Sequence, residues 1–381
     1  MKIEICTQIS QIPAQHWNAL IEDNNPFLRH EFLTALEAHQ CVGEKFGWFP
    51  RHITIYDNDE LVAAMPLYEK YNNYGEFVFD QSWAEAWQQN GLQYYPKLVS
   101  AIPYTPAIGQ RLLVKGSLHQ NYYPLLFDAL KQVAQQTSSS GFHILFPENS
   151  EQQWLAQQGM MIRHDCQFHW HNKNYTCFED FLTQLSSRKR KNIIKERQAV
   201  KNAGVTLTRL DGHQATDQHW QLFSHFYEQT FTEKWGIATL NYDFFKEVAK
   251  KLPGQVLLVL AEQNNQYIAA SLMYRSNSKL YGRFWGCDKK INGLHFEACY
   301  YQGIEYCIEH NLSTFEPGAQ GEHKVSRGFI PTLTKSCHYL MQDHFKNSID
   351  NFIEHEKRNV INYINETNKH LPYKKSNSYQ T

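Results

Sequence analysis

Hydrophobic and polar positions follow two different periods along this chain. Residues 49–56 and 61–68 are rich in β-favouring side chains and flank the polar segment 57–60, which predicts a β-hairpin. Further strands are expected at residues 1–10, 142–146, 160–171, 255–262, 267–274, 279–287 and 314–315. Capping signals and helical spacing predict helices at residues 13–21, 29–38, 82–90, 120–136, 150–158, 186–201, 214–232, 242–251 and 294–310.

A last helix is expected after a polar segment that ends at His338. Its apolar residues keep helical spacing, and we expect it to pack on the second half of the chain: Phe345, Ile349, Phe352, Ile353, Val360 and Ile364. Residues 371–381 are polar and are expected to be a disordered tail. Residues 94–105 contain prolines and aromatics, which indicate a strand and a loop that line a cleft or fill a core.

A length of 381 residues exceeds one ordinary core and indicates two domains. We expect an N-terminal domain at residues 1–173 and a C-terminal domain at residues 174–370 that carries the active site. The element order predicts α/β (α+β) domains with mixed, mainly antiparallel sheets flanked by helices. The strand at 160–171 is expected to lead out of the first domain.

Composition narrows the classes of function. The 37 basic and 38 acidic side chains nearly balance, which argues against a general nucleic-acid coat. The amino terminus lacks the apolar region of a signal peptide, and the longest apolar run, 256–261, is too short to span a membrane. Eight cysteines without a CxxC pair fit reduced thiols, so we expect a cytoplasmic location.

The segment 313–329 is the strongest candidate site. Glycines 318, 321 and 328 permit positive φ and close approach to a ligand, and the polar side chains between them supply acceptors, a proton carrier and positive charge. These side chains are Glu316, Gln320, Glu322, His323, Lys324 and Arg327. A solvated surface turn is the alternative interpretation.

Neighbouring segments supply further candidates. Arg283 and Trp285 lie two apart on one predicted strand, so we expect them to share a face that binds substrate. The helix at 294–310 offers substrate-binding candidates near its positive amino end: His295, Glu297 and Tyr300. Lys289, Lys290 and Gly293 precede this helix and could hold the phosphates of a cofactor.

Two other chemistries are open but weaker. The set Arg163, His164, Cys166, His169, His171 and Cys177 suggests a metal, but its members alternate between the two faces of a strand, so we expect none. Cys299 could be a covalent nucleophile with His295 one turn earlier, or simply a buried helix cysteine.

The helix at 186–201 is strongly basic. It carries seven cations in sixteen residues: Arg188, Lys189, Arg190, Lys191, Lys195, Arg197 and Lys201. They could bind a phosphate of the donor, a nucleotide-linked acceptor or a transfer RNA, or form a solvated helix face. An RNA-binding factor is disfavoured because no RRM-like aromatic signature accompanies the helix.

Five motifs carry a resemblance to a known family. They are Tyr74-Gly-Glu-Phe-Val-Phe-Asp80, Tyr94-Tyr-Pro-Lys-Leu98, Tyr281-Gly-Arg-Phe-Trp-Gly286, Leu294-His-Phe-Glu-Ala-Cys-Tyr-Tyr301 and the segment 313–329. Over about residues 15 to 350 the chain resembles the bacterial FemAB-like predicted N-acyltransferases, a family labelled peptidoglycan biosynthesis or recognition. The resemblance implies two tandem GNAT-like domains and transfer of an acyl or aminoacyl group onto an amine.

The resemblance also implies roles. A lysine near this position contacts the phosphate-bearing substrate or the tetrahedral intermediate in similar enzymes, so Lys324 is expected to be catalytic. GNAT-like strand order implies an acyl-CoA co-substrate. The usual glycine-rich pyrophosphate loop is absent before residue 294, however, and so is the coiled-coil arm of relatives that use aminoacyl-tRNA.

Acyl transfer to an amine requires a base and a group that stabilises the oxyanion, and the segment 313–329 offers candidates for both. An amine nucleophile needs a base, for which Glu316 is the first choice and His323 the second, while Lys324 and Arg327 can stabilise an oxyanion. We therefore expect an N-acyltransferase that takes an acyl-CoA or aminoacyl-tRNA donor and a small amine acceptor, with no metal, DNA or membrane insertion. The alternative is a non-catalytic module that binds a cell-wall precursor or nucleotide sugar.

Overall fold

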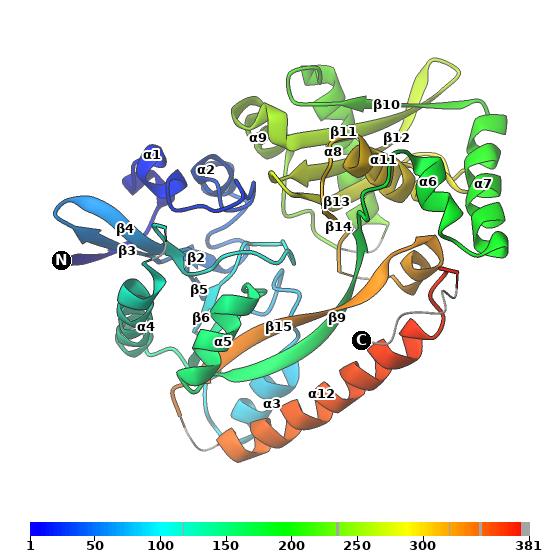
Figure 1. The fold of residues 1–381 in the computed structure, drawn as a ribbon. Coiled ribbons are helices and arrows are strands. Elements are labelled where there is room, and N and C mark those ends of the chain that lie inside the picture. Colours follow the sequence, from blue (N-terminus) through cyan, green and yellow to red (C-terminus); the bar gives the residue numbers. More distant parts are fainter. Residues whose placement is uncertain (117, 234–235, 320, 343–344, 375–381) are drawn as a thin grey trace. The chain divides into compact units, whose positions relative to one another are not determined.

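The computed structural model describes residues 1–116, 118–233, 236–319, 321–342 and 345–374. The chain forms two compact units (Figure 1). Unit 1 comprises Met1–Asp165, Thr239–Phe244 and Leu333–Ile361, and unit 2 comprises Cys166–Ala238, Phe245–Thr332 and Asn362–Thr381. Two long strands, β9 (Met161–His171) and β15 (Ile330–Leu340), carry the chain between them.

Unit 1 begins with a small antiparallel sheet whose strand order is β1-β3-β4-β7. Its strands are β1 (Lys2–Cys6), β3 (His52–Asp57), β4 (Glu60–Met65) and β7 (Leu113–Val114). The predicted hairpin is confirmed as β3 and β4, with Asn58 and Asp59 at positive φ in its turn. Two short helices precede it, α1 (Ala14–Asn18) and α2 (His30–Ala38).

A second sheet forms the centre of unit 1. It contains β2 (Trp48–Pro50), β5 (Tyr68–Lys70), β6 (Lys97–Ser100), β8 (Gly141–Leu145) and the second half of β15. Apolar residues on one face pack with α4 (His119–Gln136) and α5 (Asn149–Gln157). On another side of unit 1, α3 (Gln81–Gln89) supplies Trp83 and Trp87 to a separate apolar cluster.

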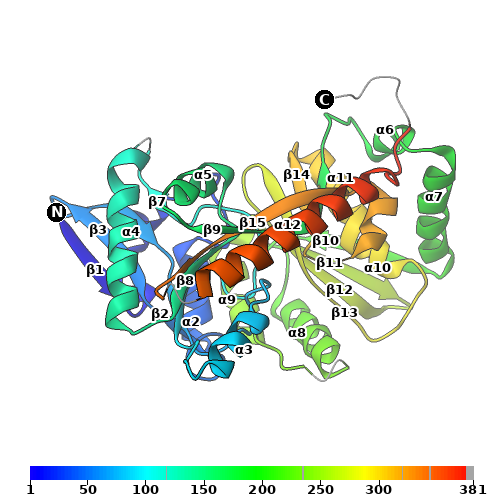
Figure 2. The same ribbon diagram turned by 90° about the horizontal axis from the view of Figure 1, so that it is seen from below.

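The final helix corrects one expectation. α12 (Lys346–Asn368) is one continuous helix (Figure 2), and its buried residues Ile349 and Ile353 pack with Trp83 and Trp87 of unit 1. The sequence predicted packing on the second domain. The error arose because β15 was not expected. Pro331 and its polar neighbours argue against a strand in the sequence, yet they belong to an eleven-residue strand that returns the chain to unit 1.

Unit 2 is built on an antiparallel run of strands that lie side by side (Figure 1). They are β10 (Val205–Leu210), β11 (Val256–Gln263), β12 (Gln266–Arg275) and β13 (Lys279–Cys287). β14 (Thr314–Glu316) then pairs parallel to β13 and antiparallel to β9. The helices of this part are α6 (Phe178–Thr183), α7 (Ser187–Asn202), α8 (Asp217–Thr232) and α9 (Tyr242–Lys251).

The helix after β13 is not uniform. α10 (Leu294–Phe296) continues into a π-helix (Glu297–Tyr301) and then α11 (Gln302–Glu309). A π segment shifts the side chains that follow it, and such segments occur frequently at functional sites. Buried residues of this helix, including Ala298, Ile304 and Cys307, pack with β11 to β14 in the core of unit 2.

Both units contain a parallel strand pair joined through a helix, β6–α4–β8 in unit 1 and β13–α11–β14 in unit 2. This arrangement within mixed, mainly antiparallel sheets confirms the expected α/β fold with two GNAT-like units. Residues 239–244 and 333–361 follow position 174 in the sequence but belong to unit 1. A single boundary between residues 173 and 174 therefore separates only the largest segment of each unit.

Two further points complete the fold. Leu371 to Lys374 do not belong to a disordered tail, because Tyr373 bridges to Leu185 and its hydroxyl donates to the Gly328 carbonyl; residues 375–381 lie outside the described part. No helix in the described part of the chain is long and apolar enough to cross a membrane.

Candidate active site

The parallel pair β13 and β14 opens at Glu316. The strands pair at Lys279 with Thr314, Leu280 with Phe315 and Tyr281 with Glu316, after which β14 ends while β13 continues to Cys287. Gly282 lies at the opening, where a Cβ would approach the Pro317 Cα to 3.1 Å. The segment after Glu316 therefore begins where the two parallel strands separate.

Glu316 is buried at this opening and faces charged neighbours. Its carboxylate accepts a hydrogen bond from Lys279 at 3.3 Å. His169 of β9 is buried nearby, and burial lowers its pKa to about 4, although Glu316 opposes this shift. The predicted base thus lies beside a neutral imidazole that the sequence had offered only as part of a metal set.

Lys324 is the most perturbed cation of the segment. It lies on a 3-10 helix (Glu322–Arg327), is 2% exposed, and donates to the Gly318 carbonyl at 2.7 Å. Gly318 and Gly321 both have positive φ, which explains why glycine is needed in this loop. Burial lowers the pKa of Lys324 to about 7, so its ammonium can exchange a proton at neutral pH.

His323 belongs to a group of rings beside this lysine. Its Nε2 lies 2.8 Å from the Tyr300 hydroxyl, and its ring packs against those of His295 and Phe296. Burial, followed by the charges of Arg327 and Lys324, lowers the pKa of His323. The imidazole is therefore neutral at pH 7 and can accept a proton. The structure thus brings together His295, Tyr300, His323 and Lys324, as predicted for a common site.

Arg327 is occupied by a structural partner. It forms a two-point ion pair with Glu196 of α7 and stacks on Phe296, with 3.3 Å between the guanidinium carbon and the ring centroid. It also donates to the His323 carbonyl at 2.7 Å. Arg327 therefore positions His323, and its role in substrate binding stays a prediction.

Glu297 is likewise held by the protein. Arg197 donates to both of its oxygens at 3.0 Å, and Gln302 donates at 2.8 Å. The sequence placed Glu297 free at a helix amino end, but it begins the π-helix and faces α7. Its partner lies 100 residues away in sequence, which no local pattern could show.

Arg283 and Trp285 do not share one face. A β-bulge between Leu272 and Met273 on the partner strand leaves Arg283 without an opposite residue and changes the alternation. Burial lowers the pKa of Arg283 to about 10, opposed by Tyr274, Tyr227 and Glu316, whereas Trp285 packs against His295. Arg283 therefore faces the Glu316 side of the site, and Trp285 faces the imidazole group.

The residues expected to hold phosphate give a poor fit. Lys289 is exposed and donates to Gln263 at 2.6 Å, and Lys290 is also exposed. Gly293 caps α10 at positive φ, where a Cβ would lie 2.9 Å from the Glu196 carbonyl, so this glycine is required for packing against α7. The first amide of the helix, Leu294, already donates to Ile291.

Glu322, Gln320 and Cys299 are the remaining candidates from the sequence. Glu322 is exposed and accepts from Tyr363 of α12 at 2.7 Å. Gln320 lies outside the described residues. Cys299 is half-buried, and desolvation raises the pKa of its thiol to about 12, so a thiolate nucleophile is disfavoured.

The basic helix α7 has two sides. Arg197 pairs with Glu297 and Glu305, while no ion pair is formed by six other cations within the described residues: Arg188, Lys189, Arg190, Lys191, Lys195 and Lys201. The sequence missed Lys279, His169 and Glu196 as members of the site. Glu196 carried one signal, since it is the only acid in a strongly basic helix.

The fold is the mixed α/β fold with GNAT-like units that the sequence predicted. A family model described as FemAB-like, peptidoglycan biosynthesis/recognition, matches residues 8–375, and the chain belongs to this family. Family and fold together support a transferase that moves acyl or aminoacyl groups in general.

Solved structures agree with the fold. The structure of FemX matches with a TM-score of 0.56 and 12% identity, covering 92% of this chain and 100% of that one. A domain of a putative lysylphosphatidylglycerol synthetase from Agrobacterium fabrum matches at 0.53 and 7% identity, covering 85% and 91%. A conserved protein of unknown function from Bacteroides thetaiotaomicron matches at 0.53 and 9%, covering 89% and 100%. None of the curated proteins compared with the chain matches it.

Proposed function

We propose that this chain is an N-acyltransferase that moves an acyl or aminoacyl group from a thioester or aminoacyl-tRNA donor to an amine. The observation that carries the proposal is the separation of β13 and β14 at the buried carboxylate of Glu316. Lys324 belongs to the same region, because both groups influence the pKa of buried His169: Glu316 raises it and Lys324 lowers it. A carboxylate that can act as a base and an ammonium group that can act as an acid then lie in one region of unit 2.

The roles follow from these groups. The acceptor nitrogen attacks the donor carbonyl carbon, and Glu316 takes the proton that the nitrogen loses. Lys324 in its charged form stabilises the oxyanion and gives a proton to the departing sulfur or ribose oxygen when the carbonyl bond to it breaks. His323, neutral and bonded to Tyr300, is the second candidate base.

The donor has two candidates. For acyl-CoA, the diverging strands would hold the pantetheine, and Lys289, Lys290 and Gly293 would hold the phosphates. That fit is weakened because the first helix amide is already bonded and α7 packs on Gly293. For aminoacyl-tRNA, the unpaired cations of α7 would bind phosphates. The proposed acceptor is a cell-wall precursor or an amino-acid-derived amine, and the proposed location is the cytoplasm.

A transfer assay tests this function. The full chain is incubated with each donor type and a panel of amines, and amide products are identified by mass spectrometry. We expect an amide product that wild type forms and Glu316→Gln forms at least about a hundredfold more slowly. Saturable binding of a cell-wall precursor without transfer from either donor would favour the recognition module, which the poor phosphate fit at Gly293 also favours.

A further inference from the structure

Unit 1 contains a second polar cluster, buried on one face of its central sheet. Four neighbouring strands each contribute one residue to a row: Lys70 of β5, Lys97 of β6, His143 of β8 and His338 of β15. Lys70 pairs with Lys97, and His143 pairs with both Val99 and His338, so the register places all four on the same face. All four are at most 1% exposed, which is costly for side chains of this kind.

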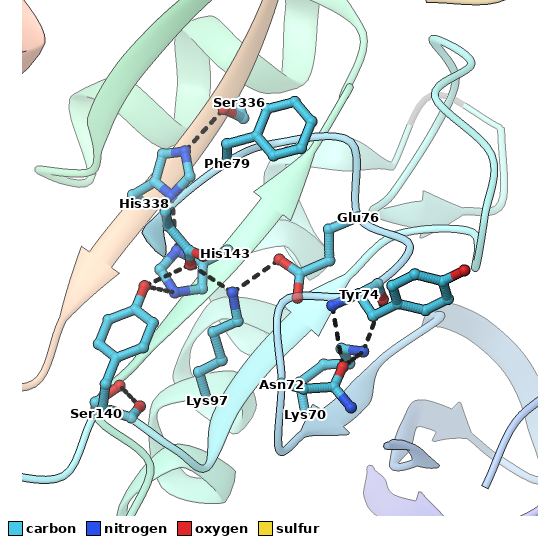
Figure 3. A network of polar contacts seen from close by, with 12 residues as sticks. Lys70, Asn72, Tyr74, Glu76, Phe79, Lys97, Ser140, His143, Ser336 and His338 are labelled. Carbon is cyan, nitrogen blue, oxygen red and sulfur yellow. Dashed lines mark hydrogen bonds and ion pairs between the residues drawn. The ribbon is translucent and has the colours of Figure 1, made fainter. Parts of the chain in front are cut away.

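Two carboxylates face this row from the loop between β5 and α3. The Lys97 ammonium lies 2.8 Å from Glu76 and forms a second, short ion pair with Asp80 (Figure 3). The exposed side chains of this loop, Tyr74 and Phe79, point away from the cluster. The inward-facing acids and the outward-facing aromatics therefore come from the same seven residues, which are the Tyr74–Asp80 family motif.

One side of the cluster is fully bonded. The Tyr94 hydroxyl donates to Oδ2 of Asp80 at 2.6 Å and lies 3.4 Å from Nε2 of His143. Nδ1 of His143 lies 2.6 Å from Nδ1 of His338, whose Nε2 lies 2.7 Å from the Ser336 hydroxyl. Burial lowers the pKa of both histidines, so this chain of hydrogen bonds is neutral.

The other side of the cluster lacks hydrogen-bond donors in the described part of the chain. Within the described residues no donor reaches Oε1 of Glu76 or Oδ1 of Asp80, although both residues are at least nine-tenths buried. Buried carboxylate oxygens without donors are rare, because each costs free energy until a partner fills the position. Lys70 does not fill it, since its ammonium donates to Asn72 and to the Tyr74 carbonyl.

We propose that Glu76 and Asp80 form a binding site in unit 1 for a ligand that carries a primary ammonium group. The two open oxygens accept its N–H groups, and the ligand charge balances the second carboxylate, which Lys97 alone leaves uncompensated. The loop that covers the two carboxylates lies between β5 and α3 and contains no helix or strand. The inference does not rest on the proposed acyl transfer.

Proton affinity supports the charge argument. Burial raises the pKa of Glu76 to about 7, with Asp80 adding to the shift while Lys97 and Lys70 oppose it. Burial lowers the pKa of Lys70 to about 7. Without a ligand, the site therefore neutralises itself by holding a proton on Glu76. A cationic ligand replaces that proton, so binding strengthens as pH rises through 7.

Ethylammonium chloride titrated into the full chain tests this site, followed by calorimetry and NMR. We expect saturable binding that is about tenfold tighter at pH 8 than at pH 6, because Glu76 must lose its proton first. At pH 6 about one proton should be released per ligand bound, measured in buffers of different ionisation enthalpy. Tetramethylammonium, which has no N–H group, and ethanol, which has no charge, should not compete.

Variants locate the site. Glu76→Gln and Asp80→Asn should each weaken ethylammonium binding by about tenfold, whereas Glu85→Gln, an exposed acid on α3, should not change it. If a substitution unfolds the chain, the proton release on ethylammonium binding and the pH dependence of its affinity, both measured on wild type, still test the proposal. Absence of saturable binding at pH 8, equal binding of tetramethylammonium, or unchanged binding in both folded variants would overturn the proposal.

Discussion

Arg327 and Glu196 form a two-point ion pair, with Nη2 to Oε1 at 2.6 Å and Nε to Oε2 at 3.2 Å. The Tyr301 hydroxyl donates to the same carboxylate. One acid of α7 thus ties together the 3-10 helix that carries Lys324 and the π-helix that carries Tyr300. The conformation of the candidate active site depends on this helix as well as on the diverging strands.

Removal of this carboxylate should destabilise unit 2. Glu196→Ala leaves the buried Arg327 guanidinium without its partner, and we expect a loss of about 2 kcal/mol in the free energy of unfolding. Glu309→Ala is the matched control, because its pair with Arg209 is more exposed and should contribute less than about 1 kcal/mol. Urea unfolding of the two variants measures the difference, and equal losses would contradict it.

Glu316 and His323 should matter for turnover more than for stability. Glu316→Gln keeps the size of the side chain, and His323→Ala removes an exposed ring, so we expect little change in melting temperature and a loss of about a hundredfold or more in transfer rate. Unfolding of both variants would instead identify the segment as structural. Glu309→Gln provides the surface control for the assay.

Lys324 should leave a signature in the pH dependence of stability. Its pKa is about 7 in the folded chain and about 10.5 when unfolded, so unfolding takes up a proton between these values. The free energy of unfolding should therefore rise with pH from 7 to 10.5, by at most about 1.4 kcal/mol per pH unit from this group. Lys324→Met should lack that contribution. Identical pH slopes in wild type and variant would show that Lys324 is not desolvated.

Cys299 should be dispensable for chemistry. Burial keeps its thiol protonated at neutral pH, so Cys299→Ala should retain transfer activity. Alkylation by iodoacetamide at pH 7 should modify exposed Cys177 before Cys299, as read by peptide mass spectrometry. Loss of turnover on alkylation of Cys299 alone would restore the covalent mechanism.

The donor can be decided by charge reversal at two places. If acyl-CoA binds, it should raise the melting temperature, and reversal of Lys289 and Lys290 to glutamate should abolish the rise; a ligand at a hundred times its Kd stabilises by about 2.7 kcal/mol. If aminoacyl-tRNA binds, reversal of exposed Lys191 and Lys195 should weaken binding and reduce its salt dependence. If reversal of one lysine pair leaves binding of its donor unchanged, that donor is not bound at the proposed place.

The sequence motifs differ in the roles that their residues have in the structure. Tyr74–Asp80 and Tyr94–Leu98 carried the family resemblance but no assigned chemistry, and they build the Glu76, Asp80 and Lys97 cluster of unit 1. Segment 313–329 was assigned chemistry, and it contains the buried Lys324. Arg327 in the same segment serves packing instead. Residue type marked these segments as unusual, but it did not separate reactive from structural members.

The sequence by itself determined the order of most helices and strands, because hydrophobic period and turn residues act over a few neighbouring positions. It did not show that Glu297 pairs with Arg197, that a bulge separates Arg283 from Trp285, or that β15 returns to β8. Only the tertiary structure decided these points. Ion pairing, burial and pKa depend on groups that are distant in sequence, so they are defined only once the chain is folded.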